Sequence, residues 1–295
     1  NGQQYSVLNF DRSSRSTSID LYDYKTLSKV KTIATSQMMD AIPYFTNYTF
    51  SDDERQVLLE TETEPIFRYS LLGLYYVYNI RSESLEKVSD YKIQEPAFSP
   101  DGTKVAYGRN NNIFIKDLIS GTTKEITFDG EKNKIINGIT DWVYEEEFAF
   151  VRAFEWNASS NKIAFIRFDE IDVPEFSMDI YGTELYQTQE VFKYPKAGED
   201  NSKVTAHIVS VKKPSIKNID LGEYEYIPRL SWSGSQNKLI LQTLNRHQNQ
   251  LKYHLVDLTG KALSHKVIYE EKSKSYVEID DNLLILKVKK QKFGK

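Results

Sequence analysis

The chain has 295 residues, of which 40% are hydrophobic, 27% are charged and none is cysteine. The absence of cysteine excludes disulfides, thiolate metal sites and a cysteine nucleophile, and a net charge of -4 argues against a protein that neutralises the nucleic-acid backbone. No apolar run approaches the roughly 20 residues that a membrane-spanning helix needs, and the histidines lack the close spacing of a zinc motif, so the sequence predicts neither a membrane span nor a metal or other cofactor.

Four segments along the chain share one pattern. Each begins with an aromatic residue, continues through a polar turn and a basic or amide residue, and ends in an apolar strand; they lie at 50–59, 98–107, 156–165 and 232–241. The clearest turn is Ser99-Pro100-Asp101-Gly102, whose residues supply the locked or positive φ that a tight turn needs. The flanking β-branched and aromatic residues suit pleated strands, so each segment predicts a β-hairpin.

A second strand pattern alternates with the first, at 19–23, 74–79, 113–117, 208–211 and 254–257, and a short polar turn and another strand follow each copy. One hairpin of each kind makes a four-stranded antiparallel unit, which recurs about every 40 to 55 residues, the period of propeller blades. A β-sandwich also contains many short strands, but it does not repeat one turn motif at blade spacing. We therefore expect an all-β fold, a β-propeller with about five blades present.

The blade spacing breaks between Asp117 and Ser210. This interval contains three consecutive glutamates at 145–147 and a polar excursion at about 172–200. Insertions in repeat proteins project from a blade and often carry function. Adjacent like charges repel each other, so we expect the glutamates to meet a cationic partner. The broken spacing also leads us to expect that they lie on a short helical insertion. A solvated acidic turn is the ordinary alternative for such a run.

Two parts of this interval resemble signature segments of a known family. Residues 137–147, Asn-Gly-Ile-Thr-Asp-Trp-Val-Tyr-Glu-Glu-Glu, and residues 194–198, Tyr-Pro-Lys-Ala-Gly, are similar to segments of the dipeptidyl peptidase IV family of prolyl oligopeptidase-type serine exopeptidases. The resemblance implies that residues 1–295 form part of an N-terminal propeller domain, about five of the family's eight blades, with the Glu motif and an extended arm inserted at about 137–200. No Gly-x-Ser-x-Gly elbow occurs, so the α/β-hydrolase domain that supplies family catalysis is expected to be absent.

The resemblance also implies a substrate site. In this family the last two glutamates of the triplet bind the free α-amine of a peptide, and an arginine from an earlier blade contacts the substrate backbone. The matching residues are Glu146, Glu147 and Arg68. Two carboxylates suit an ammonium group with three donors. For Arg68, a counterion that only offsets the acidic cluster is the alternative interpretation.

By the same resemblance, the full protein is a serine aminodipeptidase that releases N-terminal dipeptides, with Xaa-Pro preferred, from peptides with a free N-terminus. The arm at about 172–200 implies a homodimer contact, and the family implies a periplasmic or secreted location if the source is bacterial. We expect the chain alone to be inactive, with no catalytic residue of its own. Its last residues, 287–295, depart from the family pattern.

Two other interpretations stay open. A TolB-like propeller that binds proteins without catalysis shares the aromatic-Ser-Pro-Asp-Gly turn, but it does not need the acidic triplet. A gene fragment that lacks several blades would expose a strand edge and would be unstable.

Overall fold

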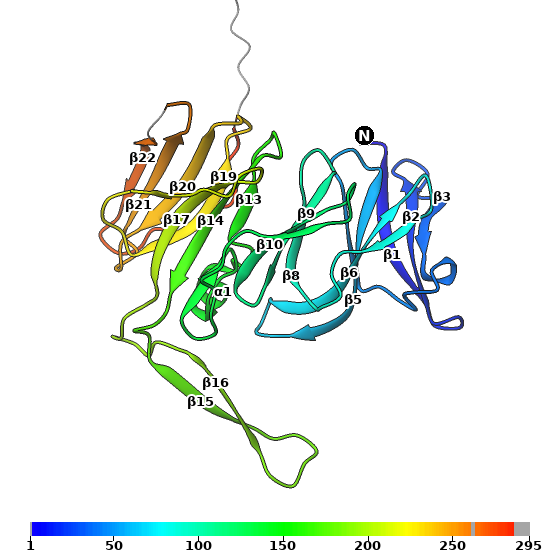
Figure 1. Ribbon diagram of the computed structural model, residues 1–295, viewed down its shortest axis with the longest axis horizontal. Helices are drawn as coiled ribbons and strands as arrows, with labels where there is room; N and C mark the ends of the chain where they lie inside the picture. Colours follow the sequence, from blue (N-terminus) through cyan, green and yellow to red (C-terminus); the bar gives the residue numbers. More distant parts are fainter. Residues whose placement is uncertain (1, 261–262, 286–295) are drawn as a thin grey trace, which may run out of the picture. The chain divides into compact units, whose positions relative to one another are not determined.

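The computed structural model describes residues 2–260 and 263–285, in which strands dominate (Figure 1). The tail at 287–295 lies outside these residues. The chain separates into two compact units, Asn1–Arg152 with Phe168–Ser202 and Ala153–Arg167 with Lys203–Lys295. None of the helices in the described residues is long and apolar enough to cross a membrane.

The first unit contains three antiparallel sheets, one helix and a two-stranded arm. The sheets are β1 (Gln4–Asp11), β2 (Ser16–Asp23) and β3 (Lys29–Thr35); β4 (Asn47–Phe50), β5 (Gln56–Pro65), β6 (Leu71–Asn79) and β7 (Leu85–Lys87); and β8 (Gln94–Phe98), β9 (Lys104–Arg109), β10 (Asn112–Asp117) and β11 (Thr123–Glu125). A 3-10 turn, η1 (Ser36–Met38), follows β3, and β12 (Ile135–Asn137) precedes helix α1 (Trp142–Phe148). The arm is the hairpin of β15 (Glu175–Ile180) and β16 (Thr188–Lys193), which extends away from these sheets in Figure 1.

The second unit contains the remaining strands in two sheets. These strands are β13 (Phe154–Trp156), β14 (Lys162–Asp169), β17 (Lys203–Ser210) and β18 (Ile216–Ile219), then β19 (Tyr226–Trp232), β20 (Lys238–Leu244), β21 (Gln250–Asp257) and β22 (Ser264–Lys272). Neighbouring strands pair antiparallel with mostly unbroken register, as in the seven-residue ladder of β20 and β21. The structure confirms the predicted all-β fold with repeated antiparallel four-stranded sheets.

The repeated turn has one hydrogen-bond pattern. In the β8–β9 turn, the N–H of Ser99 donates to the carbonyl of Lys104 at 2.8 Å, and the N–H of Lys104 donates back to the Ser99 hydroxyl at 3.0 Å. The same two bonds close the β4–β5 turn at Ser51 and the β13–β14 turn at Asn157, and the first of them recurs in the β19–β20 turn at Ser233. The side-chain oxygen thus substitutes for a backbone acceptor, which explains why Ser and Asn occupy this position.

The first sheet differs from the predicted four-stranded unit. Its β2–β3 turn is closed by the Asp23 carboxylate, which accepts the N–H groups of Lys25 and Thr26, just as Asp117 accepts two N–H groups in the β10–β11 turn. The β10–β11 turn joins the last two strands of its sheet. By this match β1, β2 and β3 correspond to the second, third and fourth strands of a complete sheet, and the described residues contain no counterpart of the first.

In the first unit, the core lies between the faces of neighbouring sheets. On β5, the consecutive residues Val57, Leu58 and Leu59 are all buried. Successive side chains of a strand point to opposite faces, so Val57 and Leu59 join the cluster that contains Phe45, whereas Leu58 joins the cluster that contains Tyr107. Because both faces of this strand are covered, its sequence is a continuous apolar run and does not alternate between apolar and polar residues.

His254 on β21 makes the second unit sensitive to acid. Its ring is 2% exposed, its Nε2 hydrogen-bonds with the Thr243 hydroxyl at 2.9 Å, and burial, with smaller contributions from the positive charges of His265 and Lys252, lowers its pKa to about 4. The unfolded chain binds this proton near pH 6.5, so the unfolded state gains protons first as pH falls. We expect the free energy of unfolding to fall by up to about 3 kcal/mol between pH 6.5 and pH 4 from this group.

Urea unfolding of the chain and of His254→Gln across this pH window checks the prediction. The variant should lose this part of the pH slope, whereas His247→Gln, at an exposed position on the loop between β20 and β21, should keep it. Equal slopes for wild type and His254→Gln would contradict a buried neutral histidine.

Candidate functional site

Helix α1 is the predicted short helix that carries the glutamates. Asp141 is its N-cap, and the Asp141 carboxylate accepts the N–H of Tyr144 at 3.0 Å and the hydroxyl hydrogen of Ser202 at 2.5 Å. Burial raises the pKa of Asp141. The helix ends at Ala149, which adopts a left-handed conformation with φ of 48°. A capping carboxylate at one end and a left-handed residue at the other fix this short helix in place.

The three glutamates have different surroundings, because adjacent residues on a helix point about 100° apart. Glu145 is 1% exposed, and its Oε1 accepts the backbone N–H groups of Tyr69 at 2.5 Å and Ser70 at 2.8 Å. Glu146 is partly buried, and its Oε2 accepts a hydrogen bond from Nε of Arg68 at 2.7 Å. Glu147 is exposed and forms no ion pair with the described residues.

Arg68 lies on the tight turn between β5 and β6. The N–H of Ile66 donates to the carbonyl of Ser70 at 2.9 Å, which closes the turn. The Arg68 side chain remains 64% exposed, and its pKa is raised by the hydrogen bond to Glu146 and by the charge of that carboxylate. Only Nε is used in the bond to Glu146, so this bond leaves the donors of the two terminal nitrogens unused.

A further carboxylate interacts electrostatically with Glu145. Glu95 on β8 is partly buried and adopts a positive φ of 49°. Burial raises the pKa of Glu95 most, the positive charge of Arg152 lowers it, and the negative charges of Glu60 and Glu145 raise it. Glu95 lies within a strand and belongs to no recognisable sequence motif, so the sequence did not indicate that it lies near Glu145 and Arg152.

The base of the arm packs against both the helix and the arginine turn. Trp142 of α1 lies against Tyr194 with ring centroids 4.3 Å apart, and Phe67, next to Arg68, lies against Phe192 of β16 at 5.7 Å. Phe176 of β15 joins the two contacts through Tyr194, at 5.4 Å, and Phe192, at 6.1 Å. The arm is therefore anchored to the two elements that carry the predicted site residues.

Glu170, where β14 leads into the arm, is a second residue without a sequence signal. It is 6% exposed, and burial, followed by the negative charge of Asp141, raises its pKa to about 7, whereas Lys193 acts in the opposite direction. The ammonium group of Lys193 donates to the carbonyl of Val173 at 2.8 Å. Glu170 thus changes charge near neutral pH beside the residue that caps α1.

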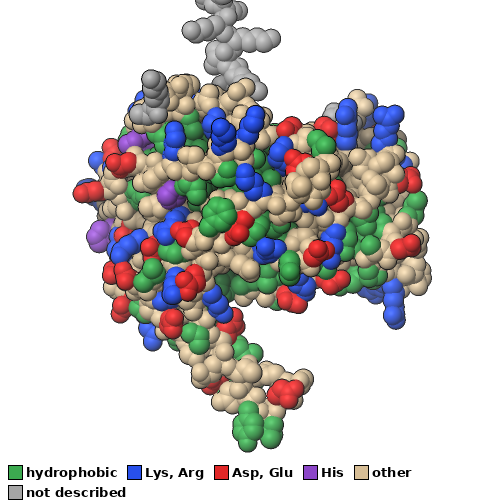
Figure 2. Space-filling view, viewed as in Figure 1, with side chains coloured by type: hydrophobic (Ala, Val, Ile, Leu, Met, Phe, Trp, Pro, Cys, Tyr) green, Lys and Arg blue, Asp and Glu red, His purple; other side chains and the backbone are tan. Residues whose placement is uncertain are grey.

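The tip of the arm is apolar and exposed. Hydrophobic side chains gather there in Figure 2, and Tyr181, Leu185 and Tyr186 are 80%, 90% and 78% exposed. Isolated exposed apolar residues are ordinary, but several together at the end of a projecting hairpin are typical of a contact surface.

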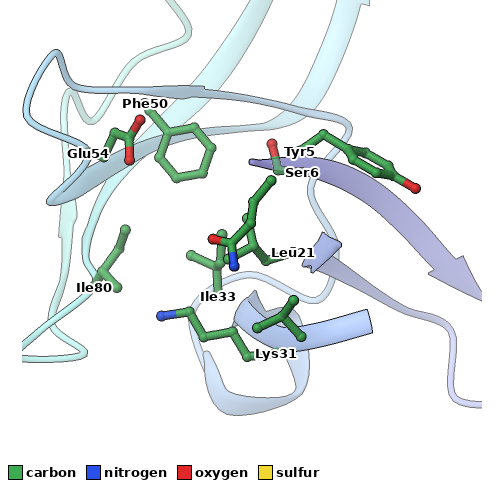
Figure 3. A pocket seen from close by; sticks show the side chains of 10 residues that line it. Tyr5, Ser6, Leu21, Lys31, Ile33, Phe50, Glu54 and Ile80 are labelled. Carbon is green, nitrogen blue, oxygen red and sulfur yellow. The ribbon is translucent and has the colours of Figure 1, made fainter. Parts of the chain in front are cut away.

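The site is separate from a pocket on the first two sheets. That pocket has a volume of about 590 Å³ and includes Tyr5, Lys31, Phe50 and Glu54 in its lining (Figure 3). It contains none of Glu145, Glu146, Glu147 and Arg68. Among residues 2–260 and 263–285, no group of three or more His, Asp or Glu side chains is arranged to hold a metal ion.

Of the sequence-predicted residues, the structure brings Arg68 and Glu146 into contact and places Glu147 next to Glu146 on helix α1. In the described part of the chain, Arg68 forms its ion pair with Glu146 and none with Glu147. The sequence interpretation missed the buried bonds of Glu145, because a run of identical residues does not show which member points inward.

Comparisons with known proteins place the chain in a family. The family described as "Dipeptidyl peptidase IV (DPP IV) N-terminal region" matches residues 51–295. Human "Prolyl endopeptidase FAP" is 32% identical over 260 residues, which cover 84% of this chain and 33% of that protein. "Probable dipeptidyl-aminopeptidase B" of Neurospora crassa is 29% identical over 292 residues, which cover 88% of this chain and 30% of that protein.

A solved structure of a dipeptidyl peptidase is similar to this chain in both sequence and fold. The crystal structure of Porphyromonas gingivalis dipeptidyl peptidase 4 is 34% identical in sequence with a TM-score of 0.83, and the match covers 92% of this chain and 40% of that one. The chain thus spans about a third of the curated relatives named above, at 33% and 30% of their lengths. The repeated four-stranded sheets are blades of a β-propeller.

Proposed function

Because this chain belongs to the dipeptidyl peptidase IV family, whose N-terminal region it matches, we propose that it is the substrate-recognition propeller of a serine aminodipeptidase. The complete enzyme releases N-terminal dipeptides, preferentially after proline, and the propeller binds the free amine of the peptide. Glu146, Glu147 and Arg68 form the amine clamp. The serine, histidine and aspartate of the reaction lie in a hydrolase domain outside residues 1–295, and these residues alone are inactive.

One observation carries the proposal: two consecutive carboxylates, one partly buried and one exposed, lie on a helix fixed at both ends, and an arginine already bonds to one of them. An ammonium group offers three donors, which the two carboxylates can accept together. The free nitrogens of Arg68 can then donate to a peptide carbonyl. A clamp of this kind fixes the distance from the amino terminus to the bond that is cut, which defines an exopeptidase.

The finer features of the proposal follow from the same elements. We assign the exposed tip of the β15–β16 arm to contact with a second copy of the chain, in agreement with its apolar residues Tyr181, Leu185 and Tyr186. We also propose that the enzyme acts outside the cytoplasm, in the periplasm or after secretion, where peptides with free amino termini are its substrates.

The amine requirement gives the direct test. In a full-length form that carries the hydrolase domain, acetylation of the substrate's α-amine should lower kcat/KM by roughly 30- to several-thousand-fold, because the carboxylates lose a charged hydrogen-bond partner. Matched Xaa-Pro peptides, free and acetylated, would be compared by release of the product behind proline. Equal cleavage of the two would show that the triplet does not bind an amine, and the interpretation of the triplet as a solvated acidic turn would then be preferred.

A further inference from the structure

The first glutamate of the triplet has a role that the amine clamp does not include. The Glu145 carboxylate is buried and accepts the N–H groups of the two residues that follow Arg68. We infer that Glu145 is a positioning residue, which holds the β5–β6 turn against helix α1 so that Arg68 meets Glu146 in the geometry that receives the peptide. This inference rests on the proposed function, because it assigns how one member of the clamp is placed.

Glu145 forms two short hydrogen bonds to backbone N–H groups. Both N–H groups, from Tyr69 at 2.5 Å and Ser70 at 2.8 Å, reach the same oxygen of a carboxylate. Hydrogen bonds to an ionised acceptor are shorter and stronger than those between neutral groups. Glu145 is 1% exposed, so its carboxylate is shielded from water. Removing the acceptor of a buried N–H group destabilises the fold more than removing the acceptor of an exposed one, because water cannot replace it. Glu145 therefore acts on the backbone of the turn, not on a ligand.

The contacts between turn and helix are in register. Arg68 bonds to Glu146, and the next two backbone N–H groups bond to Glu145, so consecutive residues of the turn meet consecutive residues of the helix. The Arg68 side chain is mostly exposed, and exposed ion pairs contribute little to holding two elements together. The buried bonds of Glu145 set this register, and the arginine pair follows from it.

The turn itself does not depend on Glu145 for its shape. It is closed by the bond from Ile66 N–H to the Ser70 carbonyl, and Phe67 packs against Phe192 of the arm. Loss of Glu145 should therefore leave the turn formed but shifted relative to α1. A misplacement of about 1 Å in a substrate-positioning group can cost about a hundredfold in rate.

The first arm of the experiment uses the full-length enzyme and free-amine peptides. Glu145→Ala should lower kcat/KM by roughly 10- to 100-fold, whereas Glu145→Gln, whose amide oxygen can accept the same two N–H groups, should stay within about threefold of wild type. In an Arg68→Ala background, Glu145→Ala should cost less than about threefold more, because the residue it positions is already absent. Full multiplication of the two losses, or inactivity of a folded Glu145→Gln enzyme, would overturn the inference.

The second arm needs no activity. Hydrogen exchange of the amides of Tyr69 and Ser70 should speed up in Glu145→Ala and remain slow in Glu147→Ala, a matched change two residues along the same helix. Unchanged protection of both amides in Glu145→Ala would refute the positioning role. If the exchange result is as expected but removal of Glu146 and Glu147 leaves cleavage intact, the hold on the turn stands and the proposed amine clamp fails.

Discussion

Glu146→Ala and Glu147→Ala, introduced one at a time into a full-length form with its hydrolase domain, should each lower kcat/KM for dipeptide release by roughly 30- to several-thousand-fold. Each change removes one acceptor from the clamped ammonium. Because the clamp also sets the distance to the bond that is cut, the loss affects both binding and alignment in the transition state. Glu146→Ala removes in addition the partner of Arg68.

The measurement is steady-state cleavage of a free-amine Xaa-Pro peptide, with Glu175→Ala as the control. Glu175 is an exposed glutamate at the start of the arm and should change cleavage little. Acetylation of the substrate should scarcely reduce the remaining activity of the two clamp variants, since loss of one of the two acceptors has already broken the clamp on the ammonium. Cleavage at wild-type efficiency by both variants would contradict the amine clamp and favour the interpretation of the triplet as a solvated acidic turn.

Phe168→Ala should lower the free energy of unfolding by about 3–5 kcal/mol, the usual cost of removing a buried phenylalanine ring. Phe168 is fully buried, and its ring meets that of Tyr144 of α1 edge to face, with centroids 4.8 Å apart. The cavity left by the substitution would lie directly against the helix that carries the glutamates. This variant should therefore destabilise the site together with the fold.

Chemical denaturation followed by tryptophan fluorescence would give the value. Phe128→Ala removes the same side chain from a position that is 70% exposed, so it should change stability by less than about 0.5 kcal/mol. A loss at Phe168 no larger than the loss at Phe128 would show that this ring contributes little to the core.

Local chemistry explains which parts of the fold were predictable from sequence. The turns at Ser51, Ser99 and Asn157 are closed by bonds between residues five apart, so a short segment contains all the information. The same is true of α1, where Asp141 caps a helix that begins at the next residue. The strand pairs within each hairpin follow for the same reason, since their register is set by these turns.

The parts that could not be predicted depend on residues distant in sequence. Glu145 finds its partners 75 and 76 residues earlier, and no pattern within the triplet distinguishes the inward-pointing glutamate from its neighbours. The three-stranded first sheet was equally hidden, because the sequence at 19–23 matches the third-strand pattern whether or not a first strand is paired nearby. Partial burial and the charges of Arg152, Glu60 and Glu145 set the pKa of Glu95, and no local sequence pattern shows either effect.

The turn between β13 and β14 has a consequence for covalent modification. Asn157-Ala158-Ser159 matches the Asn-x-Ser pattern that glycosyltransferases recognise in secretory compartments. Yet the Asn157 side chain is fully buried, and its amide nitrogen donates to Asn161 at 2.9 Å and to the carbonyl of Gln236 at 3.1 Å. That nitrogen is the atom to which a sugar would be joined, so carbohydrate attachment and closure of this turn exclude each other. Once the hairpin has formed, the pattern in the sequence is no longer an acceptor.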